Sequence, residues 1–122
     1  MKKLSSILVA VIMLVGLFTG CSSNQKADNA KKIKVGFIYV GSIGDGGWTY
    51  AQDQGRLYLA KETGVETIYK ENVKEDAAEV QKVAEDMINQ GCNVIFGTSF
   101  GFMDGMVMEA KKHPEVKFLH CS

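Results

Sequence analysis

The fold of this chain is decided by residues 33–48, which read IKVGFIYVGSIGDGGW. The first half is a short apolar run rich in β-branched and aromatic residues, which predicts a strand buried on both faces. The glycine-rich second half predicts a loop. From Trp48 to Thr63 the residues favour a helix, and Gly64 stands where a helix commonly ends. The stretch therefore predicts a strand, a glycine-rich loop and a helix in that order.

Residues 65–120 repeat this alternation. We expect further strands at the short apolar runs 65–73, 93–97 and 116–120. Four strands separated by three helices, at about thirty residues a unit, are typical of βαβ folds. Their connections are right-handed and place helices on both faces of a parallel sheet. The sequence therefore predicts an α/β fold with a Rossmann-like parallel sheet.

The two later helices are expected at about residues 76–91 and 98–113. Asp76 is a typical N-cap residue for the first of them, and Thr98 or Ser99 for the second. The helix at 76–91 has the clearest apolar stripe, formed by Val80, Val83, Ala84, Met87 and Ile88.

Ligands of such sheets bind beyond the carboxyl ends of the strands. Two loops of unusual composition follow strands there, at residues 41–48 and 97–102. The first has neither the spacing of a dinucleotide loop nor a Walker lysine, and Asp45 places a negative charge where a pyrophosphate would approach. A neutral ligand with hydroxyl groups suits Asp45 better, because a carboxylate accepts hydrogen bonds. The structural alternative is that Asp45 stabilises the start of the helix.

Aromatic residues flank both loops. Trp48 either stacks on a planar ligand or packs against the sheet edge. Of Phe100 and Phe102, we expect one to belong to the core. The methionines at 103, 106 and 108 are expected to serve helix packing.

Composition and charge exclude several function classes. The 122 residues contain 14 basic and 14 acidic side chains, and residues 1–20 hold two lysines and no acid, so the remainder has a net charge of −2. This argues against binding to nucleic acid. No serine or threonine near the loops has a plausible histidine partner, and no carboxylates are paired for acid–base work, so we expect no enzyme.

The spacing of cysteine and histidine predicts no metal site and no cofactor. His113 and His120 are expected to be surface or packing residues. Cys92 and Cys121 can pair in an exported protein, but their apolar surroundings favour small buried hydrophobes.

The N-terminus is typical of an exported lipoprotein. Residues 1–20 have a positive start and an apolar run too short to span a membrane, and Gly20 precedes Cys21 as in a bacterial lipobox. We expect residues 1–20 to be a signal peptide, Cys21 to carry lipid and residues 21–32 to be a flexible tether. The alternative is an ordinary signal peptide with an incidental cysteine.

Several spaced motifs together resemble the basic membrane protein family, also called PnrA-like, of ABC-transporter substrate-binding lipoproteins. Besides Cys21 they are VGFI at 35–38, GDGGWTY at 44–50, DQGR at 53–56, VIFGTSFG at 94–101 and HPEVKF at 113–118. The resemblance implies a periplasmic-binding-protein-like I fold with two lobes around a cleft. Residues 33–122 would be the start of the N-terminal lobe, and the chain the first part of a longer protein.

The resemblance also implies a role for particular residues. Family members often bind purine nucleosides or bases, and Trp48 stands where they carry the phenylalanine that stacks on the purine, with Asp45 and Thr49 in the same motif. Ser99 and Phe100 match the second cleft loop. The implied partners are the ligand, an ABC permease with its ATPase, and the membrane, which the lipid at Cys21 reaches on the extracytoplasmic side. The alternatives are a sugar-binding relative of the same fold and a surface sensor or adhesin lipoprotein without a role in transport.

Overall fold

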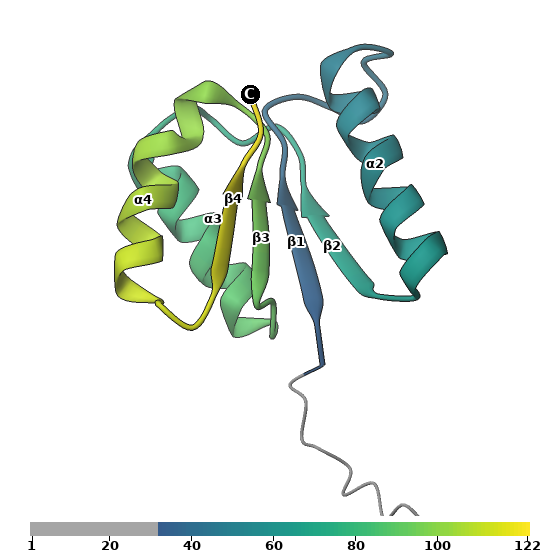
Figure 1. The fold of residues 1–122 in the computed structure, drawn as a ribbon. Coiled ribbons are helices and arrows are strands. Elements are labelled where there is room, and N and C mark those ends of the chain that lie inside the picture. Colours follow the sequence, from purple (N-terminus) through teal and green to yellow (C-terminus); the bar gives the residue numbers. More distant parts are fainter. Residues whose placement is uncertain (1–31) are drawn as a thin grey trace, which may run out of the picture. The chain divides into compact units, whose positions relative to one another are not determined.

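The computed structural model describes residues 32–122, so the expected signal peptide, Cys21 and nearly all of the expected tether lie outside the described residues. The strands form one parallel sheet in the order β2-β1-β3-β4 (Figure 1). They are β1 (Lys34–Ile38), β2 (Glu66–Lys70), β3 (Val94–Gly97) and β4 (Lys117–His120). The predicted α/β fold with a parallel sheet is confirmed.

Helices cover both faces of this sheet (Figure 1). One face carries α2 (Trp48–Thr63), and the other carries α3 (Ala77–Asn89) and α4 (Met103–Lys112), the latter preceded by the 3-10 turn η1 (Phe100–Phe102). In residues 32–122 no helix combines the length and apolar character needed to cross a membrane.

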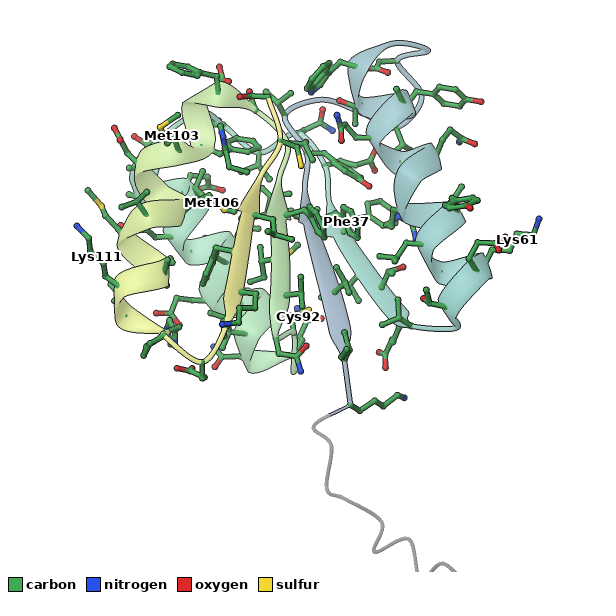
Figure 2. The ribbon with its side chains drawn as sticks, in the orientation of Figure 1. Phe37, Lys61, Cys92, Met103, Met106 and Lys111 are labelled. Carbon is green, nitrogen blue, oxygen red and sulfur yellow. The ribbon has the colours of Figure 1, made fainter. Side chains whose placement is uncertain are left out.

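Strand β1 supplies side chains to two cores. Val35 and Phe37 (Figure 2), with Tyr39 just after the strand, belong to the core on the α2 side, where the rings of Phe37 and Phe96 stack with centroids 4.9 Å apart. Ile38 points the other way, into the core that α3 and α4 share. This alternation follows from the period of two in a strand, and it confirms that β1 is buried on both faces.

Helix α2 begins and ends where the sequence predicts, and α3 begins after the predicted Asp76 cap but ends at Asn89, before the predicted end at Gly91. Gly64 has the left-handed φ of 68° and its N–H donates to the Ala60 carbonyl at 2.9 Å, which ends α2. At α3, the Asp76 carboxylate accepts the Glu79 N–H at 3.0 Å. The predicted stripe on α3 faces the core: four of its five residues are buried and Ile88 packs against them.

The start of the last helix differs from the prediction. Neither Thr98 nor Ser99 caps it, and the chain first makes the turn η1. The Thr98 hydroxyl donates instead to the Ile38 carbonyl at 2.9 Å, and the Ser99 hydroxyl donates to Glu75. Because each hydroxyl is engaged by another segment of the chain, neither is available for the helix N-terminus.

The methionines of α4 also differ from the prediction. Met106 is buried, but Met103 and Met108 are exposed, so one of the three serves packing (Figure 2). Both described cysteines are free. Cys92 is buried and precedes β3, whereas Cys121 is half-buried and follows β4, so they lie at opposite ends of two parallel strands and do not pair.

Candidate ligand-binding site

The candidate site lies between β1 and β3, where the order in which strands are added to the sheet changes from one side of β1 to the other. Strands β1 and β3 are neighbours, with Ile38 opposite Gly97, but β1 leads to α2 on one face and β3 leads to α4 on the other (Figure 1). The loops after these strands therefore leave toward opposite faces at the carboxyl edge, which is where open α/β sheets usually bind their ligands. The structure thus brings together the two loops that the sequence singled out.

Asp45 organises the first loop. Its Oδ1 accepts the N–H groups of Gly47 at 2.8 Å and Tyr50 at 3.0 Å, and its Oδ2 accepts that of Thr49 at 3.1 Å. These bonds, above all the one from Gly47, hold the pKa of Asp45 below its usual value. Asp45 therefore does stabilise the start of α2. Because a carboxylate has about four acceptor sites, the exposed Asp45 retains acceptor capacity for a ligand.

Trp48 ties the two loops together. Its indole N–H donates to the carbonyl of Thr98, fifty residues further along the chain, at 2.7 Å. The side chain is 50% exposed, so it is not packed away against the sheet. With the N–H satisfied by protein, the exposed part of the indole remains at this edge for a planar ligand.

Thr49 lies below the first loop. It is only 1% exposed, and its hydroxyl oxygen has no hydrogen-bond partner within residues 32–122. A Cβ atom at Gly41 would lie 2.9 Å from that oxygen, so the hydroxyl faces the backbone of Gly41. The side chain of Thr49 is therefore not presented at the surface with Asp45 and Trp48.

The second loop presents an aromatic side chain. Phe100 is 72% exposed whereas Phe102 is fully buried, which confirms that one of the two belongs to the core. Ser99, half-buried beside Phe100, donates its hydroxyl to Oε1 of Glu75. The N–H of Gly101 reaches the same oxygen at 3.3 Å. A Cβ atom at position 101 would lie 2.6 Å from the Cβ of Glu75, so only glycine allows this approach.

Three further residues at this edge were missed by sequence reasoning. Glu75 fixes the second loop, Glu71 accepts the N–H of Ile43 at 2.6 Å in the first loop, and Nε2 of His120 lies 2.9 Å from the Ser99 carbonyl. The available signal was positional: all three stand at or just after the carboxyl end of a strand in the same sheet.

Carboxylates set the electrostatic character of the edge. Asp45, Glu71 and Glu75 each accept a backbone N–H group from one of the two loops. They leave this edge rich in acceptors and negative charge, which suits N–H or O–H donors of a neutral ligand and opposes a phosphate. In residues 32–122 the one group with metal-ligand geometry, Glu85, Glu109 and His113, belongs to the α3–α4 layer and not to this edge.

Comparisons with known proteins agree with this architecture. A purine-binding protein of Brucella abortus is 43% identical over 112 residues, which make up 90% of this chain and 32% of that protein. A Haloferax volcanii ABC-transporter protein proposed to bind glucose is 34% identical over 91 residues, 74% of this chain and 23% of that protein. This chain therefore spans about a third or less of the length of these curated relatives.

Solved structures share the fold. An ABC-transporter solute-binding protein of Conexibacter woesei superposes with a TM-score of 0.64 at 20% identity, over 70% of this chain and 28% of that one. The family model described as ABC transporter substrate-binding protein PnrA-like matches residues 32–122. The resemblance first seen in the spaced motifs is thereby confirmed, and the chain belongs to the PnrA-like family of ABC transporter substrate-binding proteins.

Proposed function

We propose that this chain contributes the first half of a ligand-binding cleft in a substrate-binding protein of an ABC importer, and that the ligand is a purine nucleoside or purine base. The observation that carries the proposal is the half-exposed indole of Trp48, held against the second loop by its hydrogen bond to the Thr98 carbonyl. A purine is planar and aromatic, so an indole fixed in this way can stack on it. The purine-binding relative from Brucella abortus supports the same ligand class.

The polar groups of the edge would orient the ligand. Asp45 offers acceptor sites to ribose hydroxyls or to the N–H groups of the base, and Ser99 and Phe100 stand at the same edge of the sheet on the second loop. Thr49 is assigned a supporting role below the loop, because its side chain is buried. The work of the protein is then capture: the cleft closes on its ligand and is presented to a permease driven by an ATPase.

The site we propose lies on the extracytoplasmic side of the membrane, where substrate-binding proteins of ABC importers act. We further propose that the lipid at Cys21 anchors the protein there, since two or three acyl chains give stable membrane attachment. The composition of residues 22–32, polar and free of large apolar side chains, supports a tether between anchor and lobe.

A sugar is the second candidate ligand. The Haloferax volcanii relative proposed to bind glucose favours it, and so do the carboxylates, which accept hydrogen bonds from sugar hydroxyls. The two candidates differ in the need for a stacked aromatic ring. A purine depends on the face of Trp48 more strongly than a sugar does.

The test is a ligand panel on the full-length protein. Calorimetric titration with adenosine, guanosine, inosine and adenine is compared with ribose and glucose, and each ligand is also assayed for its shift of the thermal unfolding midpoint. Saturable binding and a raised midpoint with at least one purine support the proposal. A response to sugars alone selects the second candidate, and a flat response to the whole panel contradicts both.

A further inference from the structure

A second cluster of side chains, whose atoms could bind a metal ion, lies between α3 and α4. Glu85 comes from α3, Glu109 from the last turn of α4, and His113 is the residue that ends α4. One ligand atom of each lies within 4.8 Å of the others. His113 Nε2 is 3.2 Å from Oε1 of Glu85 and 3.7 Å from Oε2 of Glu109.

The buried carboxylate of Glu109 is incompletely satisfied. The residue is fully buried, and its Oε1 accepts the Gln81 amide at 3.1 Å and the Lys112 ammonium at 2.6 Å. Its Oε2 has no hydrogen-bond donor in the part of the chain that the structure describes. A buried carboxylate oxygen without a donor is costly, so an atom that fills this position would stabilise the fold. The oxygen is aimed at His113 and Glu85.

The other nitrogen of His113 is also engaged. Its Nδ1 lies 3.3 Å from Oε1 of Glu115 and its Nε2 lies 3.2 Å from Oε1 of Glu85, so both ring nitrogens face carboxylates. A metal ion at Nε2 would take the place of a proton there, while the N–H at Nδ1 donates to Glu115. A histidine ligand that donates its second N–H to a carboxylate is the usual arrangement around protein-bound zinc. Likewise the donors on Oε1 of Glu109 fix the orientation of that carboxylate. The cluster thus has both a set of ligands and groups that orient them.

We propose that Glu85, Glu109 and His113 bind a divalent transition-metal ion, for which Zn²⁺ fits the donor set best. Ligand atoms about 2.0–2.2 Å from a tetrahedral zinc ion lie about 3.3–3.5 Å apart. The separations of 3.2 and 3.7 Å bracket that value. One imidazole with two carboxylates is a zinc donor set, whereas Mg²⁺ and Ca²⁺ prefer oxygen ligands alone. The fourth position is left for water.

The position of the cluster assigns the ion a structural role. Helices of a parallel α/β sheet begin at the carboxyl edge of the strands and run back toward the amino edge. Glu109 and His113 stand at the far end of α4, away from the edge that carries Trp48 and Asp45 (Figure 1). The ion would join the end of α4 to α3 without contacting the ligand-binding loops.

Zinc titration of the full-length protein tests this site. The protein, carrying no histidine tag, is stripped with a chelator, dialysed and titrated calorimetrically with ZnCl₂, and a Co²⁺ titration records the visible d–d bands. We expect saturable binding, and we expect His113→Gln and Glu85→Gln each to abolish it. The matched control is His120→Gln, which removes the other histidine of this chain and leaves zinc binding unchanged.

A milder variant keeps the test independent of folding. Glu115→Gln removes the negative charge beside Nδ1 while keeping an oxygen that can accept its N–H, and it should weaken zinc binding by up to about tenfold. Zinc should also raise the thermal unfolding midpoint of the unaltered protein and of His120→Gln, but not that of His113→Gln. The proposal is overturned if no saturable binding occurs, which would leave a network of ion pairs, or if His113→Gln binds zinc as tightly as the unaltered protein.

Discussion

We propose that Trp48 is the residue on which ligand binding depends most in this site. Trp48→Ala removes the stacking surface, which is worth about 1–3 kcal/mol per stacked base. We therefore expect the affinity for the best purine of the panel to fall about tenfold, since a factor of ten corresponds to about 1.4 kcal/mol, which lies within this range. Trp48→Phe keeps a ring but loses the bond to Thr98, and should lose less affinity. Calorimetric titration measures both.

The control for Trp48→Ala is the thermal unfolding midpoint of the variant. Because the side chain is half-exposed, Trp48→Ala should change the thermal unfolding midpoint little. A collapse of the midpoint with unchanged affinity in the folded fraction would show that Trp48 serves packing and not the ligand.

Asp45 should give the protein a specific response to acid. The three backbone N–H donors lower the pKa of its carboxyl from the ordinary 3.8, so the ionised form stabilises the folded state. This contribution is fully present above the unfolded pKa and is lost as the pH falls through the lower folded pKa. We expect unaltered protein to be more stable than Asp45→Asn at pH 7, with the difference shrinking below pH 3.8. Urea unfolding at pH 7 and pH 3 measures it, and an equal difference at both would refute the assignment.

At the scale of elements, alanine substitutions at two helical glycines should have opposite effects on the unfolding free energy. A Cβ atom at Gly105 of α4 would lie 2.7 Å from the Cβ of Val80 and 2.9 Å from the carbonyl oxygen of Ala77, so Gly105→Ala forces α3 and α4 apart. We expect it to cost about 1–3 kcal/mol of unfolding free energy. Gly55 of α2 has no atom within 4 Å of such a Cβ, and Gly55→Ala should add about 0.5–1 kcal/mol.

Chemical denaturation of the two alanine variants decides between packing and propensity. Since both glycines lie inside helices, propensity alone would stabilise both variants. A stabilised Gly105→Ala would therefore mean that α3 and α4 separate without cost, contrary to the close contact seen here.

The helices also show which parts of the fold can be predicted from the sequence. Helix α2 was predicted with its observed bounds, because its signals are local: a glycine-rich loop before it and a left-handed Gly64 after it. The cap of the last helix was not, because Thr98 bonds to the Ile38 carbonyl and Ser99 to Glu75, and both bonds arise only when distant strands meet. Local sequence patterns predict helices and strands, but they do not show which distant residue will accept a hydrogen bond from a given hydroxyl.

In the candidate site, too, local signals could be read from the sequence whereas tertiary contacts could not. Asp45, Trp48, Ser99 and Phe100 were found from loop composition and the family motifs, and the fold places them at one edge. The burial of Thr49 and the part played by Glu71 and Glu75 were not, because they depend on how β1, β2 and β3 are ordered in the sheet. Likewise Glu85 is 28 residues from His113 along the chain, beyond the reach of any local metal-binding pattern.

For the whole molecule, the decisive prediction concerns attachment of the protein to the membrane through lipid at Cys21. Cys21→Ala should abolish incorporation of radiolabelled palmitate and move the protein from the membrane fraction to the soluble fraction, because the acyl chains would have no site. Fractionation and labelling of cells that express the full-length protein measure both effects. Cys121→Ala is the matched control and should leave both unchanged. An unaltered protein that takes up no palmitate would favour an ordinary signal peptide with an incidental cysteine, and labelling that persists in Cys21→Ala would contradict lipidation at Cys21.

The contact between Gly101 and Glu75 limits which residues can stand at position 101. A Cβ atom there would lie 2.6 Å from the Cβ of Glu75, which every residue except glycine carries, so a shorter side chain at 75 does not make room for it. A larger residue at 101 can be accommodated only if one of the two loops moves its backbone. We therefore expect an alignment of relatives to keep glycine at 101 wherever these two loops, 26 residues apart in the chain, keep their course.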